Sequence, residues 1–599
     1  MQNQPDPFMT KNLYKHQNNY LVTILISFLA LFLLSCANKT QEESVDEKLG
    51  FDQKNLNEKI KVLLSDNGWI LIENLSVESL DSLKAFYSAR DYNSFLINTL
   101  ESKSTIDSAI LILGDAYQHG IDPERYNYNR IKQIFESSLK PELESNQRHK
   151  QLAQSEILLL DAILKYSSDM RNGIVNPREL YSSTHFIPVR DSLNKMFLEP
   201  LNQVDMIRYL KEIQPKSKLY KNLQSALLRF KQMESIAWES IAVTDKKIEI
   251  GQSSEKIPSI YKKLILLELL DTTKYKTKDP VVYDSTLAGS VKTFQKINGL
   301  VDDGVIGKGT IERFNITPKQ YVEKIKLNLE RLRWFDYSDT AKYILVNIPD
   351  FKVTAVENQK RLFEIKACTG RKIDWQTVTM YGQLSYFVVN PTWTVPKSII
   401  KEEIVSGLRR DSSYLKKRNF RVYKAGERVS LDGLSASDLA SSNKYTMIQD
   451  PGAGNALGKI KFMFNNPFGI YLHDTPTRAP FNYVNRAVSH GCVRVEKPMQ
   501  LAEYLLYNNS KWNLDFLKIE IGLKVDDTTI KNEYAKVRDS LRKGNSYGVT
   551  TEIKLQNKIP LFIDYYTTWV DEDGLFNYRD DVYGRDPILL ENLKSVLSN

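Results

Sequence analysis

The sequence predicts an α+β protein of several domains: a helical scaffold domain, a small three-helix module, and a mostly-β domain that carries an inserted lid subdomain. Three observations lead to this fold class. Apolar residues return every three or four positions through residues 51–250, glycines punctuate a shorter helical pattern over 256–316, and apolar and polar residues alternate after residue 350. The chain has 599 residues, of which 42% are hydrophobic, so each domain is long enough to bury its own core.

Residues 1–35 are predicted to be a signal peptide. Two lysines precede the apolar run 21–34, which is short for a membrane span but typical of a signal-peptide core. The run ends in LLSC, which resembles a bacterial lipobox, so we expect a lipid on Cys36 and a polar tether over 36–50. The alternative is an uncleaved anchor in which Cys36 is incidental. Both place the protein in the cell envelope, facing the periplasm, and Ala37 rather than Asp after the cysteine favours the outer membrane.

Residues 51–250 are predicted to form the helical scaffold domain. Ile157 and Leu164, for example, lie on one face of an expected helix. The helical pattern breaks at 120–123 and at 173–177, because glycine tends to end a helix and the proline that follows cannot continue it. The domain has no motif that indicates chemistry, so we expect its apolar stripes to form a core.

A smaller unit is predicted over 256–316. Leu287, Val291 and Phe294 share one helix face, and the sequence FQKINGLVDDGVIGKG brings three glycines that permit tight turns. This pattern resembles the small peptidoglycan-binding domain found beside many cell-wall enzymes. The sequence leaves open whether the module binds glycan or only spaces its neighbours.

The mostly-β domain is expected over 320–520, after a helical linker at 319–333, and is completed by the segment 521–599. Val353 and Ala355 alternate with polar residues, a turn-like Glu-Asn-Gln follows, and alternation then resumes, which predicts a β-hairpin. The other expected elements are strands at 384–389, 459–464, 469–472 and 559–570, and helices at 498–507 and 530–542.

Residues 396–445 interrupt this β pattern with a helical, charged segment rich in Lys, Arg and Ser. The segment is inserted between Trp393 and the motif described next, so we expect it to act as a lid over a substrate. A decorative insertion is the alternative, because long insertions in surface loops cost little.

The residues that indicate chemistry lie between positions 471 and 498. His473 is followed by the sequence SHGC at 489–492, in a chain with only 6 histidines and 3 cysteines. A thiolate nucleophile needs a base and N–H donors for the oxyanion, and a cysteine flanked by glycine and histidine can offer them. An inert buried cysteine is the simplest alternative. A zinc site that also uses Asp474 is less favoured, because the histidine and cysteine of SHGC are too close and no second cysteine pair exists.

The order of His473, SHGC and then Val-Arg resembles the L,D-transpeptidase (YkuD) catalytic domain, whose motif residues have fixed spacing. The segments VNIPDF (346–351), NPTWTVP (390–396) and PGAGNALGKIKFMF (451–464) are similar to large YcbB-type members from Gram-negative envelopes. The resemblance implies that Cys492 is the nucleophile and His473 the base. The residues it implies for the substrate or the oxyanion are Trp393, Tyr471, Ser489, His490, Gly491 and Arg494.

The same resemblance implies a cysteine acyltransferase of peptidoglycan biosynthesis. It would form 3–3 crosslinks between stem peptides through a thioester and release D-alanine. The expected partners are a donor tetrapeptide, the diamino-acid amine of an acceptor stem, and a membrane reached through the lipid anchor; no cofactor and no metal are expected. Two alternatives stay open: an L,D-carboxypeptidase, if water resolves the thioester, and a non-catalytic peptidoglycan-binding scaffold.

Charge and cysteine usage bear on two further points, nucleic acid as a partner and disulfide bonds. The net charge of +9 is spread without runs of like charge, so nucleic acid is not an expected partner. If Cys36 carries lipid and Cys492 stays a thiol, only Cys368 remains, and no intramolecular disulfide can form. Cys368 alternates in phase with Glu364 and Lys366, so neither burial nor a function is predicted for it.

Overall fold

The computed structural model describes residues 46, 49–65, 77, 79–98, 102–188, 199–203, 205–273, 279–441, 444–544 and 546–598. The predicted signal peptide, Cys36 and most of the tether lie outside the described residues. The chain divides into two compact units, which are described separately. The first contains Met1–Ile112 and Tyr126–Ile163, and the second contains Leu113–Arg125 and Leu164–Asn599.

The first unit is helical. Its core is organised around Glu156, a fully buried carboxylate that accepts hydrogen bonds from the Tyr87 hydroxyl (2.5 Å) and from the Phe95 N–H (2.5 Å). A buried carboxylate is stable only when such donors surround it. The helices are α3 (Gln53–Leu64), α4 (Leu80–Ser88), α5 (Lys103–Gly114), α6 (Tyr128–Ser138) and the first part of α7 (Ser145–Asn172). No helix among the residues of either unit that the structure describes is long and apolar enough to cross a membrane.

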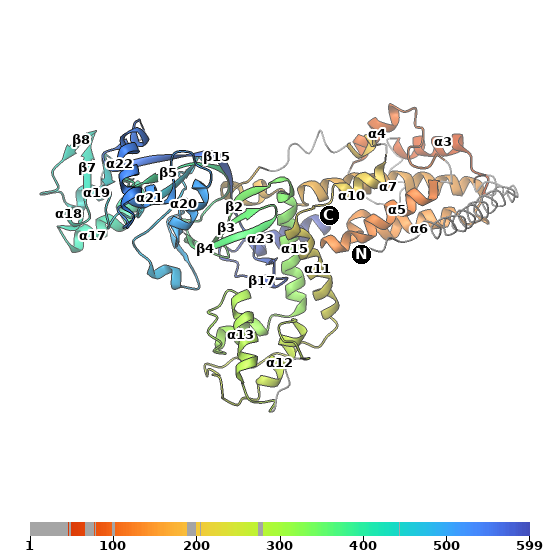
Figure 1. Ribbon diagram of the computed structural model, residues 1–599. Coiled ribbons are helices and arrows are strands. Elements are labelled where there is room, and N and C mark those ends of the chain that lie inside the picture. The colour runs from red at the N-terminus through yellow and green to blue at the C-terminus, as the bar shows by residue number, and fades with distance from the viewer. Residues whose placement is uncertain are drawn as a thin grey trace, which may run out of the picture. The chain divides into compact units, whose positions relative to one another are not determined.

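The second unit begins with helices that support its sheet. In Figure 1, α11 (Lys218–Met233) and α15 (Pro318–Trp334) pack side by side. The helical pattern was expected to continue to residue 250, but α11 ends at Met233. Tertiary hydrogen bonds explain the difference, because the Trp238 indole donates to the Phe314 carbonyl (3.0 Å) and the Ile241 N–H donates to Asn315 Oδ1 (2.8 Å).

The small module has the three helices that the sequence predicts: α12 (Ile257–Leu266), α13 (Ser285–Ile297) and α14 (Lys308–Phe314). Its core includes the stacked rings of Phe294 and Phe314, with centroids 3.8 Å apart. The glycine-rich loop is held by buried Gln295, whose side chain accepts from the Gly304 N–H (2.8 Å) and donates to the Val305 carbonyl (2.9 Å). Gly304 has φ +80°, a conformation that favours glycine.

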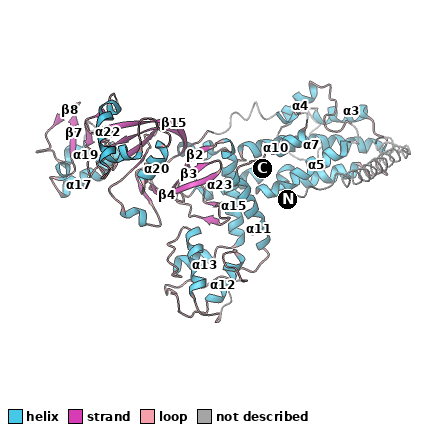
Figure 2. Ribbon diagram, viewed as in Figure 1, coloured by secondary structure: helices cyan, strands magenta, loops and turns pink. Residues whose placement is uncertain are grey.

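The described residues of the mostly-β domain form an 11-stranded sheet with the order β1-β5-β10-β11-β13-β4-β3-β2-β15-β14, with β12 paired to β4. β5 (Thr379–Val389) also pairs with β15 (Thr550–Asp564), so the strands between them form a closed circuit. Figure 2 shows β2, β3 and β4 side by side. The remaining strands are β1 (His185–Phe186), β2 (Lys342–Asn347), β3 (Lys352–Glu357), β4 (Lys360–Gly370), β10 (Ile460–Phe464), β11 (Leu472–His473), β12 (Ala487–Ser489), β13 (Val493–Val495) and β14 (Ser546–Tyr547).

The predicted hairpin is confirmed as β3 and β4, joined at Asn358 and Gln359, which both have positive φ as a two-residue type I′ turn requires. The expected strand 559–570 is wrong in its bounds. β15 ends at Asp564 because the next N–H groups bond side chains, and β16 (Thr568–Val570) pairs instead with β17 (Phe576–Tyr578). The predicted helices correspond to α20 (Pro498–Leu506) and α22 (Thr528–Arg542), and the chain also forms α21 (Leu514–Glu520) and α23 (Arg585–Ser598).

The inserted subdomain has its own hydrophobic core. The sequence suggested a helical segment, but the subdomain also contains a sheet. Its four-stranded sheet has the order β6-β9-β7-β8, and Phe420 and Val422 on β7 point into the core while Arg421 does not. This short period-2 pattern lies within a stretch dominated by lysine and arginine. The elements are β6 (Trp393–Thr394), α16 (Lys397–Ile399), the π-helix η8 (Ile400–Ile404), α17 (Val405–Arg410), α18 (Tyr414–Lys417), β7 (Phe420–Lys424), β8 (Glu427–Val429), α19 (Ala436–Ser441) and β9 (Tyr445–Gln449).

Candidate active site

Two short parallel strands bring the predicted site residues together. Leu472 of β11 lies opposite Val493 of β13, and both side chains are fully buried in the core. Because side chains alternate along a strand, Tyr471 and His473 then lie on the other face of the sheet, together with Cys492 and Arg494. The Val493 N–H donates to the Tyr471 carbonyl (3.1 Å), which fixes the register of the pair.

A cavity of about 230 Å³ opens over this face. One wall is the motif with His473 and SHGC, and the other comes from the inserted subdomain through Glu403, Tyr414, Arg418 and Gln449. Sequence reasoning missed these four residues and Trp375, because only the fold brings them to the motif. The predicted site residues that line the cavity are Trp393, Tyr471, His473, Ser489, His490, Cys492 and Arg494.

His473 is held in one tautomer. Its Nδ1 lies 2.5 Å from the Asp474 carbonyl oxygen, which can only accept, so Nδ1 carries the proton and Nε2 is free to act as a base. Burial, and to a smaller extent the nearby Arg494 guanidinium, lower the pKa of His473 to about 3. The imidazole is therefore neutral at neutral pH.

Asp474 is itself fixed from two sides. Its Oδ2 accepts the Lys459 N–H (2.7 Å), and its Oδ1 pairs with the Arg478 guanidinium (2.7 Å). Gly458 must be glycine here, because its φ is +60° and a Cβ would lie 2.3 Å from Asp474 Oδ2. The Asp474 carboxylate thus positions the backbone carbonyl that orients His473, a supporting role that the sequence did not indicate.

Cys492 begins as a thiol. Burial raises the pKa of Cys492, while hydrogen bonds from Tyr471 and the charges of Lys461 and Arg494 partly offset that rise. Its Sγ lies 3.9 Å from the Gly469 carbonyl oxygen, and within the described site no hydrogen bond joins it to His473. Catalytic hydrogen bonds are often long before substrate binds, so this geometry is compatible with proton transfer to His473.

The loop before the cysteine is braced by two hydroxyl groups. Ser489 Oγ donates to the Cys492 carbonyl (2.6 Å) and accepts the Gly491 N–H (3.2 Å). Thr377 Oγ1 donates to the Gly491 carbonyl (2.8 Å). Gly491 has φ +105°, which only glycine adopts without strain. The Gly491 N–H is therefore already engaged by Ser489 and is not a free donor for an oxyanion.

Tyr471 lies beside both proposed reacting groups. Its ring packs edge-on against His473, with centroids 5.6 Å apart. The ammonium of Lys461, which is on β10, lies 3.9 Å from the centroid of the Tyr471 ring. Burial and the neighbouring Cys492 raise the pKa of Tyr471, which keeps its hydroxyl protonated and able to donate. A hydrogen bond from the Trp393 side chain offsets this rise in part.

His490 faces the inserted subdomain. Its Nε2 lies 3.3 Å from Glu403 Oε1 on η8, and its ring packs edge-on against Trp375, with centroids 4.8 Å apart. Burial lowers the pKa of His490, and the Glu403 carboxylate opposes that shift. These contacts connect the SHGC loop to the wall of the cavity and fit an architectural role for His490.

Arg494 points a positive charge at the site. It is half-buried, and in the part of the chain that the structure describes no carboxylate lies within 4.0 Å of its guanidinium. An arginine that lines a cavity without a carboxylate partner can bind a carboxylate ligand through its planar fork. Across the described ranges, no group of three or more His, Cys, Asp or Glu side chains is arranged to hold a metal ion.

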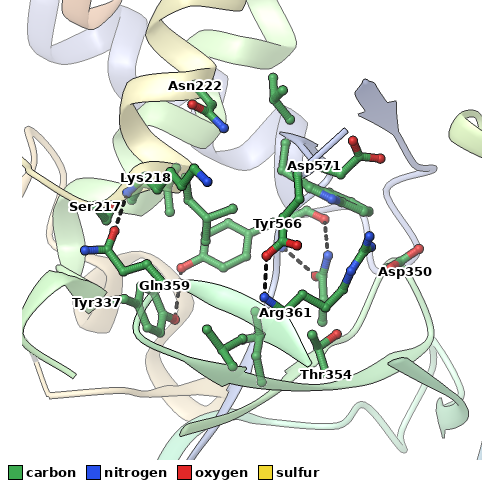
Figure 3. Close-up of a pocket in the computed structure, with 18 of the residues that line it drawn as sticks. Ser217, Lys218, Asn222, Tyr337, Asp350, Thr354, Gln359, Arg361, Tyr566 and Asp571 are labelled. Atoms are coloured by element: carbon green, nitrogen blue, oxygen red, sulfur yellow. Dashed lines mark hydrogen bonds between the residues drawn. The ribbon is translucent and has the colours of Figure 1, made fainter. Parts of the chain in front are cut away.

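Another cavity, of about 120 Å³, lies between the start of α11, the face of β2 and β3, and the segment after β16 (Figure 3). Its polar groups are largely paired: Arg361 contacts Glu364 (3.1 Å), and the Gln359 side chain accepts the Lys218 N–H (2.7 Å). No histidine or cysteine is among the described residues that line it.

Two family models match parts of the chain, and one curated protein is similar to about half of it. Residues 341–526 match the YkuD family model, described as the L,D-transpeptidase catalytic domain, and residues 81–227 match a model described as the Scaffold domain. A protein of Haemophilus influenzae named "Putative L,D-transpeptidase" is 32% identical over 278 residues, which cover 46% of this chain and 50% of that protein. The chain thus spans about half the length of this curated relative.

Two solved structures also align with part of this chain. The L,D-transpeptidase (residues 123–326) of Xylanimonas cellulosilytica is 15% identical, with a TM-score of 0.16, over 46% of this chain and 96% of that chain. The L,D-transpeptidase of Stackebrandtia nassauensis is 15% identical, with a TM-score of 0.20, over 44% of this chain and 91% of that chain.

Proposed function

We propose that the chain is a cysteine acyltransferase that forms 3–3 crosslinks between peptidoglycan stem peptides, because residues 341–526 match the YkuD model of the L,D-transpeptidase catalytic domain. The observation that carries the proposal is the shared cavity of Cys492 and a neutral His473 whose tautomer leaves Nε2 as the base. The name of the Haemophilus influenzae relative supports the same reaction class.

Arg494 would hold the donor stem. Stem peptides carry free carboxylates, and the Arg494 guanidinium faces the cavity without a carboxylate partner among the described residues. A bidentate pair would fix the peptide relative to the sulfur of Cys492, and such fixation supplies a large part of the barrier reduction in acyl transfer.

The first step would couple attack and proton transfer. His473 Nε2 takes the proton from Cys492 Sγ as the sulfur bonds the carbonyl carbon of the third stem residue, and the carbonyl oxygen becomes the oxyanion. The low pKa of His473 and the raised pKa of Cys492 favour transfer during the attack over a stable ion pair before it. The Cys492 N–H and the Tyr471 hydroxyl are the donors proposed for the oxyanion, because Ser489 already engages the Gly491 N–H.

The next steps would return the enzyme to its starting state. The carbon–nitrogen bond breaks, the protonated His473 gives its proton to the leaving D-alanine amine, and a thioester remains on Cys492. The side-chain amine of a second stem then attacks the thioester while His473 removes its proton. Collapse forms the new amide and restores the Cys492 thiol with the proton from His473.

The inserted subdomain would bias this thioester toward the amine. Tyr414, Arg418 and Gln449 form a wall of the cavity opposite Cys492, and a closed wall limits the access of water. Hydrolysis by water would make the same site an L,D-carboxypeptidase, so the wall is proposed to decide between transfer and hydrolysis.

The experiment uses the full-length chain in detergent, purified disaccharide-tetrapeptide, and product analysis by mass spectrometry. We expect a dimer that has lost one D-alanine and fragments as a 3–3 link. Cys492→Ala should abolish it, and Cys368→Ala should not, because Cys368 is fully buried on β4. Tripeptide with free D-alanine would show hydrolysis instead. No Cys492-dependent product from a folded chain would contradict the proposal.

We also propose that the chain is a lipoprotein of the outer membrane, modified on Cys36. The support is the sequence alone: the apolar run at 21–34 and the lipobox-like LLSC. Cys36→Ser should lower the mass by the lipid and release the protein from the membrane fraction. A variant with unchanged membrane partition, and no mass difference beyond the substitution, would rule the lipid out.

A further inference from the structure

Lys461 is directed at the active site by the sheet. It lies on β10 directly opposite His473 of β11, and its two neighbours in sequence, Ile460 and Phe462, are fully buried. Directly opposed residues of an antiparallel pair point to the same face, so Lys461 shares the face of His473 and not that of the core.

The ammonium of Lys461 packs against Tyr471, which lies next to Cys492. Its Nζ lies 3.9 Å from the ring centroid of Tyr471, which is within the range of a cation–π contact. In the described chain no carboxylate lies within 4.0 Å of Lys461 Nζ. Burial lowers the pKa of Lys461, and the negative charge that Cys492 carries when it is deprotonated opposes that shift.

An ammonium that is mostly buried without a carboxylate partner costs stability, because burial removes its hydration. The fold retains it next to Tyr471, where it stabilises no other acidic group of the described residues. Such a group is explained when a negative charge appears nearby during the reaction, and the sulfur of Cys492 acquires one when His473 removes its proton.

We propose that Lys461 is a positioning residue that pins the Tyr471 ring beside Cys492 and provides the fixed positive charge for the Cys492 thiolate. The inference rests on the proposed function in one respect, that Cys492 is the nucleophile. Lys461 transfers no proton: the proton moves from Cys492 Sγ to His473 Nε2, and the ammonium stays charged throughout.

Lys461 and Arg494 then have different tasks. Arg494 is among the described residues that line the cavity, and Lys461 is not; the Lys461 ammonium lies against the Tyr471 ring instead. A substrate carboxylate that pairs with Arg494 cancels the charge of Arg494. The charge of Lys461 persists in the substrate complex, so the thiolate keeps one counter-charge when substrate is bound.

The test follows the alkylation of Cys492 by iodoacetamide as a function of pH in the full-length chain without substrate, read by peptide mass. The titratable and charged groups that face the sulfur are Tyr471 and His473 beside it, Lys461 from β10 and Arg494 from β13. Lys461→Met should move the alkylation profile up by about one pH unit, so that alkylation near neutral pH slows about tenfold. Lys461→Arg should restore the wild-type profile.

Two controls separate charge from structure. Lys554→Met removes an exposed lysine from β15 of the same sheet and should leave the profile unchanged. Thermal unfolding of Lys461→Met should occur at or above the wild-type temperature, because a buried cation is removed; Lys461→Gln serves as the second variant.

A folded Lys461→Met chain with the wild-type profile would overturn the inference. A loss of folding in both Lys461→Met and Lys461→Gln would also overturn it, because the lysine would then be structural. Because alkylation needs no stem peptide, a shifted profile without any crosslinked product would sustain the inference and reject the proposed reaction.

Discussion

Two corners of the second unit contain the same residue types and behave differently. In the scaffold corner, His119, Tyr220 and Arg333 meet near α11 and α15; in the catalytic corner, His473 meets Tyr471 and Arg494. Burial lowers the pKa of both histidines to about 3, and a nearby arginine adds to the effect in each. The shifted pKa alone therefore does not distinguish a catalytic histidine from a structural one.

The difference lies in the partners of the charges. Arg333 pairs with buried Glu330 (2.6 Å) and donates to the His119 carbonyl (2.8 Å) and to the Tyr220 hydroxyl (3.2 Å). Glu330 in turn accepts the N–H groups of Ile174 (2.6 Å) and Val175 (2.9 Å). The two buried charges of this corner therefore neutralise each other in an ion pair, although Arg333 Nε has no hydrogen-bond partner among the described residues.

The catalytic corner lacks such an ion pair. In the described residues neither Arg494 nor Lys461 has a carboxylate within 4.0 Å, and His473 Nε2 faces the cavity side while its Nδ1 is bonded to Asp474. Positive charge without a partner is costly for a fold and useful to a ligand or a transition state. The comparison teaches that incomplete pairing, more than burial, marks the functional site.

The largest expected contrast comes from replacing each histidine with glutamine. His473→Gln should lower turnover about 10³-fold by removing the general base, with little change in thermal unfolding. His119→Gln should lower stability by about 1 kcal/mol and leave the turnover of the folded protein unchanged. D-alanine release and differential scanning calorimetry measure the two effects. Equal losses of turnover in both variants would break the comparison.

A second contrast concerns the two arginines. Arg333→Met leaves the Glu330 carboxylate buried and unpaired, so we expect about 3 kcal/mol of destabilisation in urea unfolding. Arg494→Met should leave unfolding unchanged and raise KM for the tetrapeptide about tenfold. A destabilised Arg494 variant with a normal KM would assign that residue to the scaffold instead.

Acid should affect both corners alike. The unfolded histidines bind a proton below pH 6.5, whereas the folded ones do so only near pH 3. Stability is therefore complete above pH 6.5 and falls between pH 6.5 and 3, by at most about 1.4 kcal/mol per pH unit for each histidine. Each glutamine variant should reduce the slope of unfolding free energy against pH by this amount, and an unchanged slope in either would contradict the burial of that histidine.

The smallest effect is expected at the brace of the catalytic loop. Ser489→Ala removes the bonds to the Cys492 carbonyl and the Gly491 N–H, which should cost about 1 kcal/mol of stability. The freed Gly491 N–H then becomes available to the oxyanion, so the turnover of the folded variant should change little. Parallel measurement of unfolding and D-alanine release checks this, and a turnover loss as large as that of His473→Gln would show that Ser489 is catalytic.

Local patterns foretold much of the site. The spacing of His473 and SHGC, with strands on either side, was enough to place the proposed nucleophile and the proposed base on one short stretch of chain, because β11 and the loop before β13 are close in sequence. The hairpin of β3 and β4 followed equally well from period-2 alternation and its turn.

Features that depend on pairing could not be foretold. Lys461 looks like one polar residue in an apolar strand, and its role emerges only when β10 is registered against β11. Cys368 was not expected to be buried, yet it is fully enclosed and burial raises its pKa to about 11. Ala367 and Thr369 are enclosed as well, so β4 is covered on both faces there, and alternation no longer reports exposure.

The pairing of β15 has a consequence for the order of events during synthesis. β15 runs from Thr550 to Asp564 and joins β2 to β5, although these strands are made roughly two hundred residues earlier. On the ribosome, Cys492 and His473 emerge before the strand that completes their sheet. The site around Cys492 is therefore assembled late. In a nascent chain Cys492 is incompletely enclosed until β15 pairs with β2 and β5.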